Sequence, residues 1–156
     1  EEIEKLLPFT RKFMSATRQG FDIVIGSRRK TRTGAPWTRK IMGTGMIVLR
    51  TTLVGLPDIE DTQCGFKLFS KDSAHTVFEK IKKIHNGFKN IDRSSVTAGF
   101  DVELLYIATK EGYKIKEVPV DWLYVETRRV SPIKDSIDGL LDLMRIRRNI
   151  IKKVYS

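Results

Sequence analysis

The sequence has few residues that build covalent or metal frameworks: its 156 residues include one cysteine and two histidines. A single cysteine, Cys64, excludes an internal disulfide, and these three residues are too few for a structural zinc site. The lack of disulfides favours a reducing compartment such as the cytosol. No apolar run approaches the roughly 18 residues that a membrane span needs, and the first residues lack a signal-peptide pattern. We therefore expect a soluble or peripheral protein.

Positive charge, in contrast, is abundant. The chain has 29 basic and 19 acidic residues, a net charge of +10. This excess favours an anionic partner, which is a nucleic acid, a phosphorylated substrate or an acidic membrane surface. The basic residues gather in three stretches, residues 28–40, 127–129 and 145–153. Each stretch also has the composition of an ordinary solvated surface, so charge alone does not choose the partner.

Hydrophobic periodicity predicts one α/β domain over residues 1–156. The expected strands are 21–27, which has the composition of a strand buried on both faces, a strand that follows the turn near residue 60, and 113–125. Pro119 places the last of these at a sheet edge or a bulge. Ser70 or Asp72 is the expected cap of the third helix, and Gly112 ends the fourth. The expected helices are 1–20, 37–53, 71–84, 100–112 and 132–156.

The first expected strand ends in Gly26 and Ser27, which places Arg28 at the carboxyl end of the sheet. Open α/β sheets bind their ligands at this end. Arg39, at the start of the next helix, is expected to face the same crevice, and arginine can hold a phosphate through two parallel hydrogen bonds. In the alternative interpretation, Gly26 and Ser27 only turn the chain and Arg28 is solvated. The sequence leaves both open.

Three acidic residues, Asp58, Glu60 and Asp61, crowd one short turn. Carboxylates so close together repel one another. Either all three are solvated, or at least one lies beside a cation, which is a metal ion or an arginine. The turn is therefore a candidate site that depends on what lies next to it in space.

Cys64, Asp101 and Glu103 have simpler explanations than catalysis. Cys64 precedes an apolar strand, and no histidine lies near it in sequence to activate its thiol, so we interpret it as a buried packing residue. Asp101 and Glu103 open a helix, where the helix dipole alone favours acidic residues.

The final expected helix, residues 132–156, is amphipathic and basic. Its apolar stripe consists of Ile133, Ile137, Leu140, Leu141 and Met144. This composition is typical of a helix at an anionic membrane surface. In the alternative interpretation the stripe packs on the domain and only the tail is solvated. The basic residues beside the stripe, which we assign to the membrane surface, are Arg145, Arg147, Arg148, Lys152 and Lys153.

Several stretches, taken in order, closely resemble the polyprenyl-phosphate glycosyltransferases of glycosyltransferase family two. Within that family, DTQCGFK resembles the dolichyl-phosphate β-glucosyltransferase type. The resemblance covers nearly the whole chain. The matching stretches are DIVIGSR (22–28), Arg39 with MGTG, DTQCGFKLF (61–69), GFDVELLYIA (99–108), GYKIKEVPVDW (112–122) and the closing SPIKD with DLMRIRR.

The resemblance implies a GT-A, Rossmann-like glycosyltransferase domain, of which this chain is the acceptor half. A preceding nucleotide-binding half, with an Asp-x-Asp motif, is expected to hold a divalent metal, Mg²⁺ or Mn²⁺, and this chain itself no metal. The implied reaction is inverting transfer of a hexose, glucose from the nucleotide sugar UDP-glucose, to dolichyl or another polyprenyl phosphate. The enzyme is expected to be cytoplasmic and peripheral at the membrane, and the fragment alone inactive.

The resemblance also assigns roles to individual residues. Asp61 stands where the family has a catalytic acid, and Asp101 is the second candidate. A phosphate monoester has a second pKa of about 6, so it is mostly ionised at about pH 7. Asp61 is therefore expected to position the acceptor, or to contact the metal or the sugar, rather than to remove a proton. The substrate-binding candidates are Ser27, Arg28, Arg39 and Lys67.

The alternative function is that of a basic, non-catalytic fragment that binds a membrane surface or nucleic acid. Nucleic acid is disfavoured because the chain lacks interleaved aromatic residues, a helix-turn-helix signature and a zinc signature.

Overall fold

The α/β class expected from the sequence is observed in a computed structural model, which describes residues 4, 20–28, 37–85, 98–120 and 132–156. The helix expected at the N-terminus and the polar stretch 86–97 fall outside these residues, apart from Glu4 and Gly20. The elements, in chain order, are β1 (Ile23–Ser27), α2 (Trp37–Val54), β2 (Lys67–Phe69), α3 (Lys71–Ile84), α4 (Ala98–Lys110), β3 (Ile115–Pro119) and α5 (Pro132–Ile151).

β1 is the central strand of a mixed sheet with the order β2-β1-β3. β3 runs parallel to β1 and places Glu117 opposite Ile25, whereas β2 runs antiparallel and places Lys67 opposite the same residue. All five residues of β1 are buried. Ile23 and Ile25 join the main core, and Val24 joins a smaller cluster. The strand is therefore covered on both faces, and β3 is an edge strand among the described strands, as Pro119 predicted.

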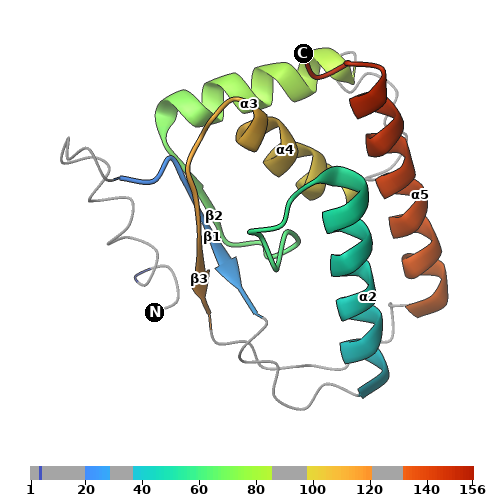
Figure 1. Ribbon diagram of the computed structural model, residues 1–156. Helices are drawn as coiled ribbons and strands as arrows, with labels where there is room; N and C mark the ends of the chain where they lie inside the picture. Colours follow the sequence, from blue (N-terminus) through green and yellow to red (C-terminus); the bar gives the residue numbers. More distant parts are fainter. Residues whose placement is uncertain (1–3, 5–19, 29–36, 86–97, 121–131) are drawn as a thin grey trace.

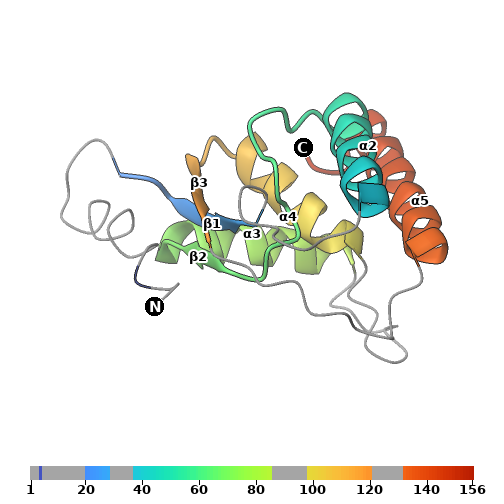
Figure 2. The same cartoon turned by 90° about the horizontal axis from the view of Figure 1, so that it is seen from below.

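The helices form a layered arrangement beside the sheet (Figures 1 and 2). α4 lies in the middle and contacts α3 and α5, while α2 packs beside α5 in both views. A helix with neighbours on several sides must be apolar around most of its surface. The buried apolar residues of α4 are Val102, Leu104, Leu105, Ile107 and Ala108.

Two predicted helix boundaries are confirmed by their hydrogen bonds. Ser70, rather than Asp72, is the N-cap of α3, and its Oγ accepts a hydrogen bond from the Ser73 N–H at 3.2 Å. Gly112 follows α4 with a φ of 81°, a conformation that glycine adopts without steric cost.

The last helix is shorter than the expected 132–156, because α5 ends at Ile151. Lys153 adopts a φ of 56°, and its N–H donates to the Ile150 carbonyl. The Val154 N–H donates to the Asn149 carbonyl. These two bonds form a Schellman motif, which closes the helix and turns the chain back. Tyr155 is consequently buried, and the last residues form a turn rather than a further helical turn.

Gly26 allows the turn that contains Cys64 to approach β1 closely. A Cβ atom at residue 26 would lie 2.9 Å from Cys64 Sγ and 3.1 Å from Val120 Cγ1. Any side chain there would have to displace buried neighbours.

Gly26→Ala is therefore expected to lower the free energy of unfolding by about 1–3 kcal/mol, the usual cost of overpacking. The midpoint of urea unfolding measures this effect. Gly65→Ala is the matched control, because a Cβ at residue 65 meets nothing within 4 Å. Equal losses in the two variants would contradict the close approach at Gly26.

Candidate functional site

Arg28 and Asp61 form a bidentate ion pair at the carboxyl end of β1. Arg28 Nε donates to Asp61 Oδ2 and Nη2 donates to Oδ1, each at 2.8 Å, and the Arg28 backbone N–H donates to Oδ2 at 2.9 Å. Asp61 is only 7% exposed, whereas Asp58 and Glu60 are exposed. The second of the two alternatives for this acidic turn is therefore the one observed, because Asp61 lies beside a cation, which is an arginine.

A second ion pair adjoins the first. Lys67 Nζ donates to Asp101 Oδ1 at 2.9 Å and to the Cys64 carbonyl at 2.6 Å. The hydrogen bonds with Asp61 raise the pKa of the Arg28 guanidinium above its ordinary value, and the charge of Asp101 adds to this effect. The structure thus brings four of the predicted site residues together: Arg28 directly after β1, Lys67 in β2, Asp101 in α4 and Asp61 in the acidic turn.

The other two substrate-binding candidates are less well defined. Ser27 is the last residue of β1, where it is buried, and its carbonyl accepts a hydrogen bond from the Val120 N–H at 3.0 Å. Arg39 lies in the first turn of α2, and its side chain falls outside the described part of the chain. The roles assigned to both residues stay predictions.

Cys64 forms the inner corner of the site. Its side chain is buried against Gly26, and burial raises the pKa of its thiol. A raised pKa leaves less of the nucleophilic thiolate at neutral pH. These observations agree with our interpretation of Cys64 as a packing residue.

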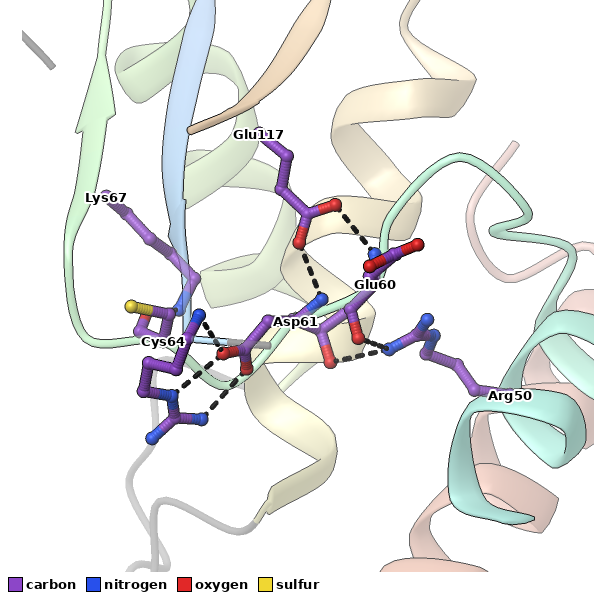
Figure 3. Close-up of polar contacts among 8 residues, drawn as sticks. Arg50, Glu60, Asp61, Cys64, Lys67 and Glu117 are labelled. Atoms are coloured by element: carbon purple, nitrogen blue, oxygen red, sulfur yellow. Dashed lines mark hydrogen bonds and ion pairs between the residues drawn. The ribbon is translucent and has the colours of Figure 1, made fainter. Parts of the chain in front are cut away.

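Glu117, which the sequence analysis did not select, supports the acidic turn. Its Oε1 accepts a hydrogen bond from the Asp61 N–H at 2.6 Å, and its Oε2 accepts one from the Glu60 N–H at 2.8 Å. Figure 3 shows the carboxylate spanning both N–H groups. No sequence motif indicated this contact, because it depends on the pairing of β3 with β1.

Arg50 holds the opposite side of the same turn (Figure 3). It is 5% exposed and donates hydrogen bonds to the carbonyls of Ile59 and Glu60 and to Thr62 Oγ1. One signal could have identified it: Arg50 is the only charged residue in the stretch 41–54. A lone charge in an apolar helix needs buried partners.

Glu103 is buried, which its place beside Asp101 in the sequence did not indicate. Its Oε1 accepts a hydrogen bond from Tyr155 Oη at 2.6 Å, and its Oε2 lies 2.8 Å from His85 Nε2. Burial, together with the hydrogen bond to Glu103, raises the pKa of Tyr155. These contacts tie α4 to the end of α3 and to the C-terminal turn, so Glu103 has a structural role.

The described residues do not provide a metal site. No group of three or more His, Cys, Asp or Glu residues suited to a metal ion occurs among them. Asp61 and Asp101 each face a basic side chain. We therefore assign no chemical step to a metal held by these residues.

α5 has two apolar stripes, and only one packs on the domain. Leu143 and Ile146 are buried in the core. Three residues of the stripe selected from the sequence face outward: Ile137, Leu141 and Met144 are 54%, 58% and 56% exposed. Leu140 is half-buried, and the side chain of Ile133 falls outside the described part of the chain. Most of the described stripe therefore does not pack on the domain, because other α5 residues fill the core. Its contact with a membrane surface stays a prediction.

The five basic residues assigned to the membrane surface all lie near this outer stripe or after it. Arg147 and Arg148 are exposed on α5, and Lys152 and Lys153 are exposed in the turn that follows. Arg145 pairs with Asp142 at 2.9 Å, which offsets part of its charge. None of the helices in the described ranges has both the length and the apolar character to cross a bilayer.

Comparison with curated proteins finds relatives that are named dolichyl-phosphate beta-glucosyltransferases. The dolichyl-phosphate beta-glucosyltransferase of Trichomonas vaginalis is 34% identical over 140 residues, which is 87% of this chain and 38% of that protein. The Dictyostelium discoideum protein of the same name is 36% identical over 109 residues, which is 70% of this chain and 29% of that protein. The Saccharomyces cerevisiae protein of the same name is 31% identical over 139 residues, which is 85% of this chain and 37% of that protein. No family model and no solved structure matches.

These relatives are glycosyltransferases by name, and their similarity extends over most of this chain. More narrowly, all three are named dolichyl-phosphate β-glucosyltransferases, the type that DTQCGFK resembles, and the chain is 31–36% identical to them. It spans about two fifths or less of the length of the curated relatives it matches, with shares of 38%, 29% and 37%.

Proposed function

We propose that this chain forms the acceptor side of a glycosyltransferase that moves glucose from UDP-glucose to dolichyl phosphate with inversion at the sugar. The observation that carries the proposal is the Arg28–Asp61 pair at the carboxyl end of β1, in a chain similar to dolichyl-phosphate β-glucosyltransferases. The proposal includes a GT-A architecture for the whole protein. It assigns the nucleotide and the divalent metal to residues other than those described here.

The reaction joins two anionic partners. A phosphate oxygen of the lipid forms a bond to C1 of glucose, the bond from C1 to the diphosphate breaks, and UDP leaves. The lipid phosphate is mostly ionised at about pH 7, since its second pKa is near 6, and it needs little deprotonation. The site must instead supply positive charge that offsets the repulsion between the phosphates.

Arg28 and Lys67, together with Arg39, are the proposed ligands of the lipid phosphate. Arg28 and Lys67 face Asp61 and Asp101, so an incoming phosphate competes with carboxylates for them. In this proposal Asp61 keeps the Arg28 guanidinium in a fixed orientation before the lipid arrives. Such preorganisation lowers the entropic cost of reaching the reactive geometry.

Replacing Asp61 in the full-length enzyme tests this role. Asp61→Asn is expected to lower glucose transfer to dolichyl phosphate by roughly 100-fold, the scale of a small misplacement of reacting groups. The pH profile is expected to keep its shape, because no proton transfer is lost. Transfer is measured with radiolabelled UDP-glucose across a pH series, with Asp58→Asn as the control in the same turn. A new, strong dependence on the acid side in Asp61→Asn would contradict a positioning role.

The lipid acceptor also requires contact with a membrane surface. We propose that the outer stripe of α5, defined by Ile137, Leu141 and Met144, lies on an anionic, cytoplasmic membrane surface. Its exposure and the basic residues near it support this placement. Each basic residue near such a surface contributes about 1 kcal/mol.

The double variant Leu141→Ser with Met144→Ser is expected to lower the protein's cosedimentation with phosphatidylserine liposomes by about tenfold. The reason is that two apolar side chains that enter the membrane surface would be lost. Phe78→Ser removes an exposed aromatic residue from α3 and is the matched control. Binding to duplex DNA is measured at the same salt concentration. Unchanged liposome binding by the double variant would contradict the placement, and tighter binding to DNA would favour the nucleic-acid alternative.

A further inference from the structure

The acidic turn that contains Asp61 depends on side chains for the hydrogen bonds that fix its backbone. Between α2 and β2, residues 55–66 form neither helix nor strand. Their N–H and C=O groups therefore have no regular ladder of partners, although buried backbone polar groups require them. The position of the Asp61 carboxylate depends on which groups supply these bonds.

Glu117 binds the N–H side of the turn. One carboxylate oxygen accepts from Asp61 at 2.6 Å and the other accepts from Glu60 at 2.8 Å. Hydrogen bonds to an ionised carboxylate are stronger than those between neutral groups. Glu117 pairs in register with Ile25, three residues before Arg28 on the neighbouring strand. The sheet thus places the support for Asp61 and its cation on adjacent strands.

Arg50 binds the carbonyl side of the turn from α2. Its guanidinium donates to the carbonyls of Ile59 and Glu60 and, at 3.3 Å, to Thr62 Oγ1. Arg50 is almost fully buried, so its charged guanidinium needs hydrogen-bond partners, and these oxygens are among them. A lysine could not reproduce this contact, because it lacks the planar fork of donors.

We propose that Glu117 and Arg50 are positioning residues that fix the Asp61 carboxylate against Arg28. The two residues hold opposite edges of one short backbone segment, and the Asp61 side chain is then bound by three donors of Arg28. The catalytic consequence rests on the proposed function. The geometric claim concerns the protein without ligand.

The first test measures the ligand-free protein by NMR after isotope labelling. Glu117→Gln keeps the size of the side chain but replaces one acceptor oxygen by an amide donor. It is expected to speed hydrogen exchange of the Glu60 and Asp61 amides by roughly tenfold, since a hydrogen bond to a charged group is lost. It is also expected to speed exchange of the Arg28 Nε–H, which donates to Asp61. A purely structural role would not change this side-chain signal selectively.

Glu111→Gln is the matched control. Glu111 also pairs with a basic side chain, Lys80 at 2.6 Å, but this partner belongs to α3 and not to the acidic turn. It is expected to leave the three signals unchanged. Arg50→Lys is the second variant and is expected to speed exchange of the Arg28 Nε–H in the same direction. If neither Glu117→Gln nor Arg50→Lys changes the Arg28 Nε–H exchange, the proposal is overturned.

The second arm adds farnesyl phosphate, a short polyprenyl phosphate, and follows its binding by phosphorus NMR. Wild-type protein is expected to bind it, and Glu117→Gln to bind it several-fold more weakly. Failure of the wild type to bind would count against the proposed function, while the Arg28 Nε–H exchange would still decide the geometric claim. Equal binding by wild type and Glu117→Gln, despite faster Arg28 exchange, would overturn a positioning role for Glu117.

Discussion

The Asp61 carboxylate has little contact with water and forms an ion pair with Arg28 instead. Further hydrogen bonds from the surrounding structure stabilise this pair. The Asp61 side chain is 8% exposed and that of Arg28 is 18% exposed. An ion pair so little exposed loses hydration energy, and it is stabilising only when further hydrogen bonds accompany it. Here the Arg28 backbone N–H supplies a third bond to the same carboxylate. Removal of either partner would leave a largely buried charge.

The pair also connects the fold to the site. β1 is buried on both faces, so the position of Arg28 at its end is set by the core. The acidic turn reaches Arg28 from the other side, held by residues of β3 and α2. Lys67 and Asp101 form a neighbouring pair of opposite charges, so the cluster of four is nearly neutral. A phosphate would therefore bind Arg28 and Lys67 by displacing their carboxylate partners, rather than by entering a site with a large net positive charge.

Local patterns predicted the helices and strands that the structure describes. The helix expected at residues 1–20 lies outside the described residues apart from Glu4 and Gly20, and the roles assigned to the site residues stay predictions. The β-branched run that becomes β1 placed Arg28 correctly, and the crowding of acids indicated that one of them needs a cation. Ser70 and Gly112 marked helix ends because their chemistry is local. Contacts set by register or tertiary packing were missed: Glu117 depends on the pairing of β3 with β1, and Arg50 depends on the packing of α2 beside the acidic turn. The sequence left open which side of α5 faces outward, because this depends on how the helix meets α2 and α4.

The central claim is that the Arg28–Asp61 pair marks the binding site of the lipid phosphate. A crystal structure of the protein with a short polyprenyl phosphate tests it most directly. The account predicts phosphate oxygens about 2.7–2.9 Å from the Arg28 guanidinium, the usual length of a charge-assisted hydrogen bond, at the carboxyl end of β1. A phosphate bound elsewhere, with the Arg28–Asp61 pair unchanged and Lys67 not in contact with the ligand, would contradict it.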